Sequence, residues 1–338
     1  MSKTNRPTKK KLIEILKKHG FSKQALADEL SVDEKSVRRW CVFYEVDTEY
    51  EKKKHLIQHQ PVDVRVSSKT STAHPITVSA GEESRRVFVF SDYQIPYHNH
   101  KAHSIAVQRC SDYLNDKEFK GQAYVIIIGD FQDYNPLIGK DKLKQPHIAP
   151  DELKALELEF LESSKVLSEI EAVLPKNCIK IFMKGNHEDR ADKLIGKPNG
   201  DVWKKLIDID DRLGLTESGW KVFKYNENYK IGHLHYTHGS FHGKNHAAQH
   251  AASYQKNVMY GHTHQLQTFT QQSPVRELPI WACSIGCLSD VNPEWQRNRP
   301  NAHELAFAEV SYIGDKFYPA VHRIIDNVVV IGGKMYRA

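Results

Sequence analysis

Cysteine and long hydrophobic runs are what this chain most clearly lacks. Its 338 residues contain five cysteines, an odd number without the spacing of a disulfide framework. No run of about 18 apolar residues is present, as a membrane-spanning helix would need, and the polar, lysine-rich first residues do not resemble a signal peptide. We therefore expect a cytoplasmic protein without a membrane partner, in which Cys283 and Cys287 are buried free thiols.

Charge is unevenly distributed along the chain. The net charge is +6, and 40% of the residues are hydrophobic, as in a globular protein. Residues 1–60 contain 14 Lys and Arg against 9 Asp and Glu, a net of +5. A length of 338 residues favours two domains. The sequence therefore predicts a small basic domain joined to a larger, almost neutral one.

The basic segment, residues 1–60, contains sequence patterns typical of three helices. Residues 9–18 have the apolar period of an amphipathic helix that a glycine would end. Ser22 is a good N-cap for a helix over residues 23–30, and Asp33 can cap a third helix that runs to Phe43. Small and apolar residues fall where a helix-turn-helix needs core contacts, at Ala27, Leu30, Val32, Val37 and Trp40. The segment therefore resembles helix-turn-helix domains.

That resemblance implies that the third helix binds nucleic acid. Residues 34–39 would begin the recognition helix, with some polar side chains on phosphates and others on base edges. These side chains are Lys35, Ser36, Arg38 and Arg39. A small protein-interaction domain with a solvated basic face is the alternative, but the excess of positive charge favours nucleic acid. We expect DNA as the partner, with RNA and the oligomeric state left open.

A linker is predicted over residues 58–85. The segment is rich in Ser, Thr and Pro and has no sustained apolar period, although residues 62–66 alternate as a short strand would. The predicted organisation is therefore a small all-α helix-turn-helix domain over residues 1–57, the linker, and a larger domain over residues 86–338.

Five short motifs occur in order along the larger domain. They supply acidic residues, an amide and several imidazoles at Asp92-Tyr93-Gln94, Gly129-Asp130-Phe131-Gln132-Asp133, Gly185-Asn186-His187-Glu188, His238-Gly239 and Gly261-His262-Thr263-His264. Four of them follow apolar runs typical of strands, at residues 86–91, 123–128, 178–183 and 257–260. Because open α/β sheets bind ligands at the carboxyl ends of their strands, we expect the motifs to form one site.

Carboxylate, amide and imidazole donors in one cluster suit a pair of divalent cations. Two such ions about 3.5–4 Å apart can bind a phosphate ester, activate water and stabilise the leaving oxygen. One carboxylate can bridge the pair by lending an oxygen to each ion, and mixed nitrogen and oxygen donors suit Mn, Zn or Fe. The motifs contain no cysteine, which argues against a structural zinc site.

In this order the motifs resemble those of the calcineurin-like metallophosphoesterases, over residues 86–330. That family includes DNA-repair exonucleases, and phage-type phosphoesterases are a further likeness. The resemblance implies an α/β fold, with an α/β/β/α sandwich and two divalent metal ions. It implies the metal ligands Asp92, Gln94 and His264 for the first ion, Asp130 as the bridge, and Asn186, His238 and His262 for the second. It further implies that His187 protonates the leaving oxygen and that Asp133 orients this imidazole.

Two positions depart from the family pattern. Gln94 stands where the family has a histidine, and its carbonyl is a harder, neutral donor, so the first ion would bind more weakly. We therefore expect Mn, with Mg, Fe or Zn as alternatives. Tyr134 stands where protein phosphatases carry an arginine, which argues against a protein-phosphatase role. Arg190 could supply that charge or be a solvated residue at a helix start.

The other histidines, and each predicted ligand taken alone, can also be explained without metal binding. His242, His246 and His250 follow His238 at intervals of four, and we expect them at the rim of the site or on a helix surface. His98 could compensate for the weaker ligand Gln94, but we expect it to be a rim or turn histidine. Acidic N-caps, loop histidines and a turn asparagine could explain single motifs. Such coincidences do not explain five motifs in one order.

The remaining segments are predicted to be scaffold. Residues 151–174 have the pattern of a long amphipathic helix, and residues 305–312, 317–324 and 327–331 that of antiparallel strands. The loop over residues 289–301 carries Trp295, Arg297 and Arg299, which suit a strand of nucleic acid.

The sequence thus predicts a metal-dependent phosphodiesterase that cleaves nucleic acid, as a DNA nuclease tethered by its helix-turn-helix domain. Two alternatives remain open. One is a phosphomonoesterase that acts on a protein or a small molecule. The other is a DNA-binding regulator whose metal site is impaired by Gln94.

Overall fold

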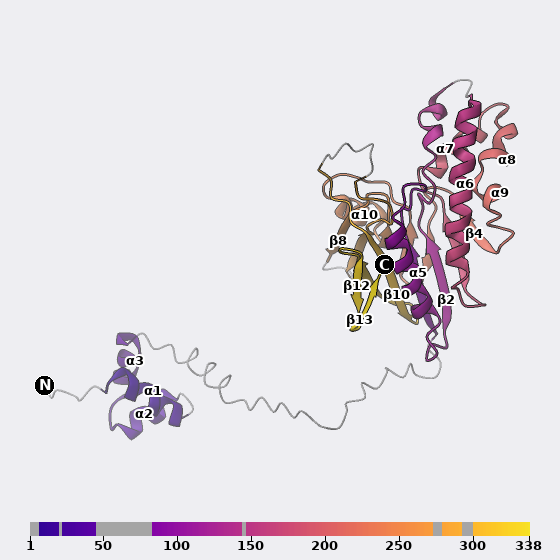
Figure 1. Ribbon diagram of the computed structural model, residues 1–338. Coiled ribbons are helices and arrows are strands. Elements are labelled where there is room, and N and C mark those ends of the chain that lie inside the picture. Colours follow the sequence, from indigo (N-terminus) through magenta and orange to yellow (C-terminus); the bar gives the residue numbers. More distant parts are fainter. Residues whose placement is uncertain (1–6, 20–21, 45–82, 144–146, 273–278, 293–299) are drawn as a thin grey trace. The chain divides into compact units, whose positions relative to one another are not determined.

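The computed structural model describes residues 7–19, 22–44, 83–143, 147–272, 279–292 and 300–338 (Figure 1). The chain divides into two compact units, Met1–Thr77 and Val78–Ala338. Three predictions fall wholly or largely outside the described residues: the linker, the strand over residues 62–66, and the loop segment with Trp295, Arg297 and Arg299.

Three helices pack together in the N-terminal unit. α1 (Lys9–Lys18), α2 (Lys23–Glu29) and α3 (Glu34–Phe43) lie where the sequence predicts helices. Ser22 Oγ accepts a hydrogen bond from the Ala25 amide at 3.3 Å. Asp33 Oδ1 accepts one from the Ser36 amide at 2.8 Å, so both predicted N-caps form. The shared core buries Leu12, Leu16, Leu26, Ala27, Val37 and Trp40. The helix-turn-helix interpretation stays a prediction.

Two large β-sheets form the centre of the second unit, within its described residues. The first has the strand order β11–β10–β1–β2–β3–β4. Its parallel strands are β1 (Ser84–Phe90), β2 (Gln122–Ile127), β3 (Ile179–Met183) and β4 (Trp220–Phe223). Beside β1 the sheet continues antiparallel with β10 (Ala306–Ile313) and β11 (Lys316–Arg323).

The second sheet has the strand order β5–β6–β7–β9–β8. Its strands are β5 (Tyr229–Ile231), β6 (Leu234–Thr237), β7 (Asn257–Tyr260), β8 (Leu266–Gln271) and β9 (Ile280–Ile285). β6, β7 and β9 run parallel, and the two edge strands are antiparallel to their neighbours.

The two sheets share one apolar core because the strands of the first sheet are apolar on both faces. Val87 and Val89 of β1 lie in this core with Met259 of β7. The alternate residues Phe88 and Phe90 lie in a different core, on the helix side of the sheet. A parallel sheet that is covered on both faces requires such continuous apolar strands.

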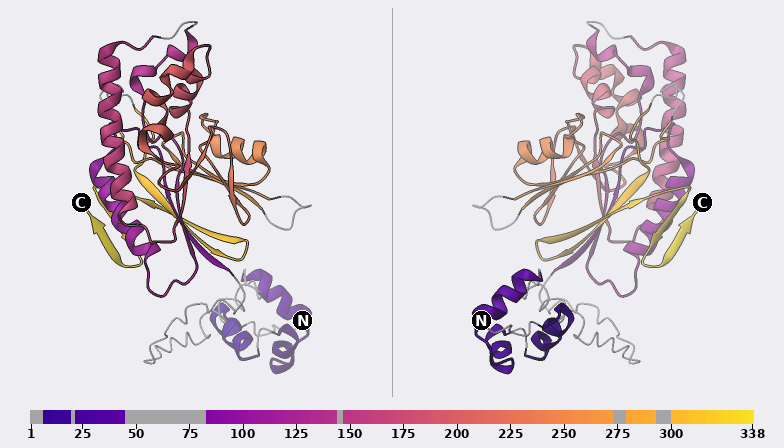
Figure 2. Two further views of the ribbon diagram at one scale, coloured as in Figure 1. Left: turned by 90° about the vertical axis from the view of Figure 1, so that its right-hand side faces the viewer. Right: turned by 90° about the vertical axis from the view of Figure 1, so that its left-hand side faces the viewer.

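Helices cover the outer faces of both sheets (Figure 2). α5 (His100–Leu114) and α6 (Pro150–Glu171) pack on the first sheet, and α10 (His246–Tyr254) packs on the second. The shorter helices are α7 (Glu188–Ile195), α8 (Lys204–Ile207), α9 (Ile209–Leu213) and the 3₁₀ turns η1 (Asn135–Leu137), η2 (Lys140–Lys142) and η3 (Gly200–Trp203). The predicted mixed α/β class is confirmed. No helix in the described ranges is long and apolar enough to cross a membrane.

Two scaffold elements differ from the sequence prediction. α6 ends at Glu171, and residues 172–174 form a turn instead of helix. The predicted strand near residue 328 does not join either large sheet. It is β12 (Val328–Ile331), which pairs with the unpredicted β13 (Lys334–Arg337) in a separate hairpin. The hairpin is anchored on α5, where Tyr336 Oη donates to Asp112 Oδ2 at 2.8 Å.

A buried pair of tyrosines joins the two sheets. Tyr236 Oη of β6 and Tyr312 Oη of β10 lie 2.8 Å apart in the inter-sheet core. Tyr236→Phe should lower the free energy of unfolding in urea by about 1–3 kcal/mol, because it leaves the Tyr312 hydroxyl buried without a partner. The double variant Y236F/Y312F should cost less than the sum of the two single variants. Tyr318→Phe, at a 54% exposed position, is the control. Additive costs would contradict the pairing.

Candidate metal centre

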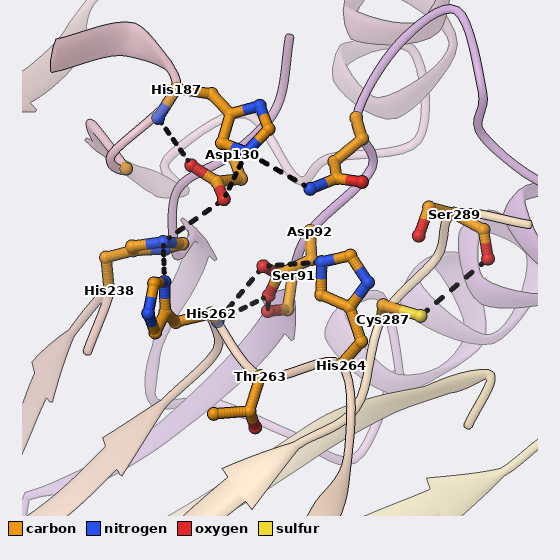
Figure 3. Close-up of polar contacts among 12 residues, drawn as sticks. Ser91, Asp92, Asp130, His187, His238, His262, Thr263, His264, Cys287 and Ser289 are labelled. Atoms are coloured by element: carbon orange, nitrogen blue, oxygen red, sulfur yellow. Dashed lines mark hydrogen bonds and ion pairs between the residues drawn. The ribbon is translucent and has the colours of Figure 1, made fainter. Parts of the chain in front are cut away.

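The five motifs meet where strands of both sheets end. β1, β2 and β3 run parallel and lead into the loops of Asp92, Asp130 and Asn186. β6 and β7 run parallel in the second sheet and lead into His238 and His262. Figure 3 shows the labelled carboxylates and imidazoles turned toward one another. The predicted convergence of the motifs on one site is therefore what the fold produces.

Asp130 lies at the centre of the group. Its side chain is buried, and its Oδ1 accepts a hydrogen bond from the His187 amide at 2.9 Å. Its Oδ2 lies 3.3 Å from His238 Nε2 and 3.6 Å from His187 Nε2. Burial opposes ionisation, but these two imidazoles outweigh it and hold the pKa of Asp130 well below its usual range. The carboxylate is therefore a fixed negative charge in the core.

Asn186, His238 and His262 surround Asp130 on the side of the second sheet. Asn186 Oδ1 lies 2.7 Å from His262 Nδ1 and 3.0 Å from His238 Nε2. His238 Nδ1 donates to the Ile128 carbonyl at 2.9 Å, which fixes the ring so that Nε2 faces the centre. Burial alone would lower the pKa of His238, but Asp130 raises it to about 9. Burial and the His238 charge lower the pKa of His262 to about 4.

A carboxylate–imidazole pair lies beside this group. Asp92 Oδ1 lies 3.3 Å from His264 Nε2, and both Asp92 oxygens accept from the His262 amide at 3.0 Å. Ser91 Oγ donates to Asp92 Oδ2 as well. The buried Nδ1 of His264 has no hydrogen-bond partner among the described residues. Asp92 and His264 are thus joined to the Asp130 group through His262.

The predicted proton donor lies between two carboxylates. His187 Nδ1 is 3.0 Å from Asp133 Oδ1 and 2.8 Å from the Asp133 carbonyl, while Nε2 faces Asp130. Burial opposes protonation of this ring, but Asp130 and Asp133 outweigh it and raise the pKa of His187. Gln94 Nε2 lies 3.5 Å from His187 Nε2. Arg190 is half-buried; its Nη1 donates to the Asp133 carbonyl at 2.7 Å, and its Nη2 lies 3.1 Å from His187 Nε2.

The backbone is strained at the donor positions. Asp92, Gln94, Asp130, His262 and His264 have positive φ angles between 47° and 69°. This left-handed conformation costs a residue other than glycine roughly 1–3 kcal/mol and persists only where the surroundings enforce it. Such strain clusters at functional sites, so its presence at five predicted ligands indicates that this geometry serves a function.

Two motif glycines are required by the close approach of the acidic ligands. A Cβ on Gly185 would lie 2.1 Å from Asp130 Oδ1, and one on Gly261 would lie 2.2 Å from Asp92 Oδ2. Each glycine therefore makes room for a carboxylate that comes from a neighbouring strand end. The glycines occur in the motifs because the acidic side chains pack directly on the backbone of another ligand loop.

Glu188 is a supporting residue that sequence reasoning missed. It is 1% exposed, and its carboxylate accepts the amides of Asp130 at 3.0 Å, Gln132 at 2.9 Å and Gly185 at 2.7 Å. It thereby ties the loop after β2 to the loop after β3. Its place as the last residue of the Gly185-Asn186-His187-Glu188 motif was the available signal.

The helix-cap explanation of Asp92 and Asp130 and the left-handed-turn explanation of Asn186 are wrong. No described helix is capped by Asp92 or Asp130; α5 is capped by Asn99, whose Oδ1 accepts from the Ala102 amide at 2.9 Å. Asn186 is not among the residues with positive φ.

The expected rim histidines are also mostly buried. His242 is exposed, but His246 and His250 are buried in α10. His246 Nδ1 lies 2.6 Å from Tyr260 Oη, and His250 Nε2 accepts from the Ser240 amide at 3.1 Å. His98 is buried too, which lowers its pKa to about 4. The spacing of four could not distinguish a buried from an exposed helix face.

The predicted nucleic-acid contacts lie on α3 of the other unit. Lys35, Arg38 and Arg39 are exposed, whereas Ser36 is half-buried and donates to Asp33 Oδ2 at 2.9 Å. Arg38 forms an exposed ion pair with Glu34 at 2.8 Å. An exposed pair of this kind contributes little, so Arg38 stays available to a phosphate.

A cleft of about 860 Å³ lies away from the metal centre, with Lys230, Lys256, Trp281 and Lys316 among its lining residues. The lining residues Asn257 and Trp281 lie at the beginnings of β7 and β9, whereas the motifs follow the ends of the strands. The cleft therefore does not contribute to the chemistry at Asp130.

Comparisons with known proteins leave the family open. No family model and no curated protein match the chain. Among solved structures, vacuolar protein sorting 29 from Cryptosporidium parvum is similar with a TM-score of 0.39 and 16% identity, over 76% of this chain and 96% of that one. Vps29 from Chaetomium thermophilum has a TM-score of 0.40 and 8% identity, over 75% and 98%. At such TM-scores the likeness bears no weight, and the site itself has to indicate the function.

The close packing of Asp130 on Gly185 predicts that a methyl group added at Gly185 weakens metal binding. Gly185→Ala should displace the Asp130 carboxylate and weaken metal binding by more than about tenfold, since even outer partners of ligands contribute 10–100-fold. Gly243→Ala is the control, because its nearest contact would be the flexible Gln249 side chain at 3.5 Å. Titration with Mn²⁺ measures both affinities, and equal affinities would contradict the close packing on Gly185.

Proposed function

We propose that this protein is a dinuclear-metal-dependent phosphodiesterase that hydrolyses nucleic acid, with DNA as its substrate. The observation that supports the proposal is the convergence of carboxylate, amide and imidazole donors from five strand ends around Asp130. In this reading the N-terminal unit tethers the enzyme to its polymeric substrate.

The donor set fits divalent cations. Asp130, His238 and His262 have ligand atoms within 4.8 Å of one another, and the ring nitrogen of His238 that faces Asp130 is free of the main chain. With Asn186 they would hold one ion, and Asp92 with His264 would hold the other. When bound, the ions would place positive charge at the phosphate and make a water molecule more acidic. Nitrogen and oxygen donors without cysteine favour Mn, with Mg, Fe or Zn as alternatives.

His187 would move the proton that the leaving oxygen needs. Asp133 and its carbonyl hold Nδ1, so Nε2 is the ring atom that faces the centre. Arg190 lies against the same ring nitrogen at 3.1 Å, and its guanidinium would neutralise charge on the phosphate once a substrate displaces this contact. Asp133 acts through His187 and is therefore a positioning residue.

Gln94 supports a second candidate function. Its side-chain amide lies 3.5 Å from His187 Nε2, and an amide is a neutral donor. If Gln94 does not bind an ion, the first ion would rest on Asp92, His264 and the shared Asp130. The second candidate is therefore a DNA-binding regulator with an impaired metal centre.

Hydrolysis in the presence of Mn²⁺ is the first expected outcome. The full chain should cleave end-labelled DNA and a chromogenic phosphodiester, and a chelator should abolish both activities. Asp130→Asn should lower the rate by more than about 100-fold, because it removes the shared negative charge that holds both ions.

Asp151→Asn is the matched control, since it removes one negative charge from an exposed position of α6 and should leave the rate unchanged. If the protein hydrolyses only the monoester, it is a phosphatase and not a nuclease. Absence of any metal-dependent hydrolysis would favour the regulator.

DNA binding by α3 is the second expected outcome. Arg38→Ala/Arg39→Ala should weaken binding of the full chain to duplex DNA by roughly tenfold or more, as measured by fluorescence anisotropy, and should reduce its salt dependence. Lys10→Ala/Lys17→Ala removes the same charge from exposed positions of α1 and should have a smaller effect. Equal losses would mean that binding follows net charge and not the α3 surface.

A further inference from the structure

A second group of metal-ligand side chains lies apart from the Asp130 group. His98, His100 and Glu162 offer two imidazoles and one carboxylate, with one ligand atom from each within 4.8 Å of the others. His98 follows the Gln94 loop, His100 is the first residue of α5, and Glu162 lies in α6. The five motifs contain none of these residues.

His98 is the side chain that most needs an explanation. Its side chain is 1% exposed, yet neither ring nitrogen has a hydrogen-bond partner among the residues that the structure describes. Buried polar atoms are almost always paired, so two unpaired nitrogens on one ring indicate a partner that is not part of the polypeptide. Nε2 lies 3.6 Å from Glu162 Oε1. This distance is too long for a hydrogen bond, but it is short enough for both atoms to bind one ion.

The neighbouring side chains do not supply that partner. The His100 ring lies edge-on to His98, with centroids 4.3 Å apart. The nitrogens of His103 are used elsewhere: Nδ1 lies 3.0 Å from Tyr93 Oη, and Nε2 lies 2.8 Å from Glu169 Oε2. A ligand shared by His98, His100 and Glu162 would satisfy the ring.

We propose that His98, His100 and Glu162 bind a transition-metal ion of the zinc type, at a site separate from the dinuclear centre. Two histidines and one glutamate form a known zinc donor set, which leaves a fourth position for water. Bonds of about 2.0–2.1 Å put tetrahedral ligand atoms roughly 3.3 Å apart. The 3.6 Å between His98 and Glu162 therefore needs little movement to accept an ion.

Lys165 is the cation that now neutralises Glu162. Its Nζ lies 3.5 Å from Glu162 Oε1, and its side chain is 60% exposed. An exposed ion pair of this kind is weak, so the lysine can turn into solvent and release the carboxylate to an ion.

An ion at this site would join three elements near the metal centre. It would fasten the end of the Gln94 loop to the beginning of α5 and to the middle of α6. The same loop is held to the segment after β9 by the Asn99 amide, which donates to the Leu288 carbonyl at 2.8 Å. The ion would thus stiffen the loop that carries Gln94 without sharing a ligand with the dinuclear centre.

Counting zinc tests this site without relying on activity. Full-length protein is stripped with a chelator, dialysed against a fixed concentration of free Zn²⁺ and analysed for zinc per chain. His100→Ala and Glu162→Gln should each lose one equivalent, or bind it more than about tenfold more weakly. Neither residue is deeply buried, so both variants should keep the wild-type circular dichroism spectrum.

Matched controls separate the site from surface binding. Asp151→Asn changes the same charge on the same helix, and His147→Ala removes an exposed histidine; both should retain the equivalent. Asp130→Asn should lose the zinc of the dinuclear centre alone, so adding His100→Ala to Asp130→Asn should lower the zinc count by one further equivalent. An unchanged zinc count in His100→Ala and Glu162→Gln, or an equal loss in Asp151→Asn and His147→Ala, would overturn the proposal.

Discussion

The buried carboxylate of Asp130 is the constraint on which the candidate site depends. A negative charge in the core is costly unless donors and positive charges surround it. Asp130 meets this requirement through the His187 amide and the imidazoles of His187 and His238, which come from two different sheets. The ends of β2, β3 and β6, which lead into Asp130, His187 and His238, must therefore lie close together. The packing of two partly parallel sheets against each other brings these ends together.

The convergence in turn explains the local sequence. Gly185 leaves room for Asp130, and five predicted donors hold positive φ angles that only a rigid surrounding would enforce. Glu188 supplies part of that rigidity, because it binds three main-chain amides from two ligand loops. The Ile128 carbonyl supplies another part by fixing the His238 ring. These outer contacts orient the donors before any ion arrives, which is what a metal site requires.

Much of this architecture was predictable, because strands and ligand motifs depend on local patterns. The apolar runs before Asp92, Asp130 and Asn186 gave strand positions within a few residues. Burial of single polar residues was not predictable, since it depends on tertiary packing. His246 and His250 were expected at a surface or rim, but α10 turns both toward the second sheet. The motif marked Glu188, but its role was overlooked because its partners are main-chain amides that come together only in the folded chain. β13 was missed because its four residues have only one buried side chain.

The donors around Asp130 should hold a pair of metal ions. Anomalous scattering from crystals of the full chain grown with Mn²⁺ tests it most directly. Two peaks roughly 3.5–4 Å apart are expected. Both should contact Asp130, one also contacting Asp92 and His264, and the other contacting Asn186, His238 and His262. A map with no peak beside Asp130, or with ions bound only by other residues, would contradict it.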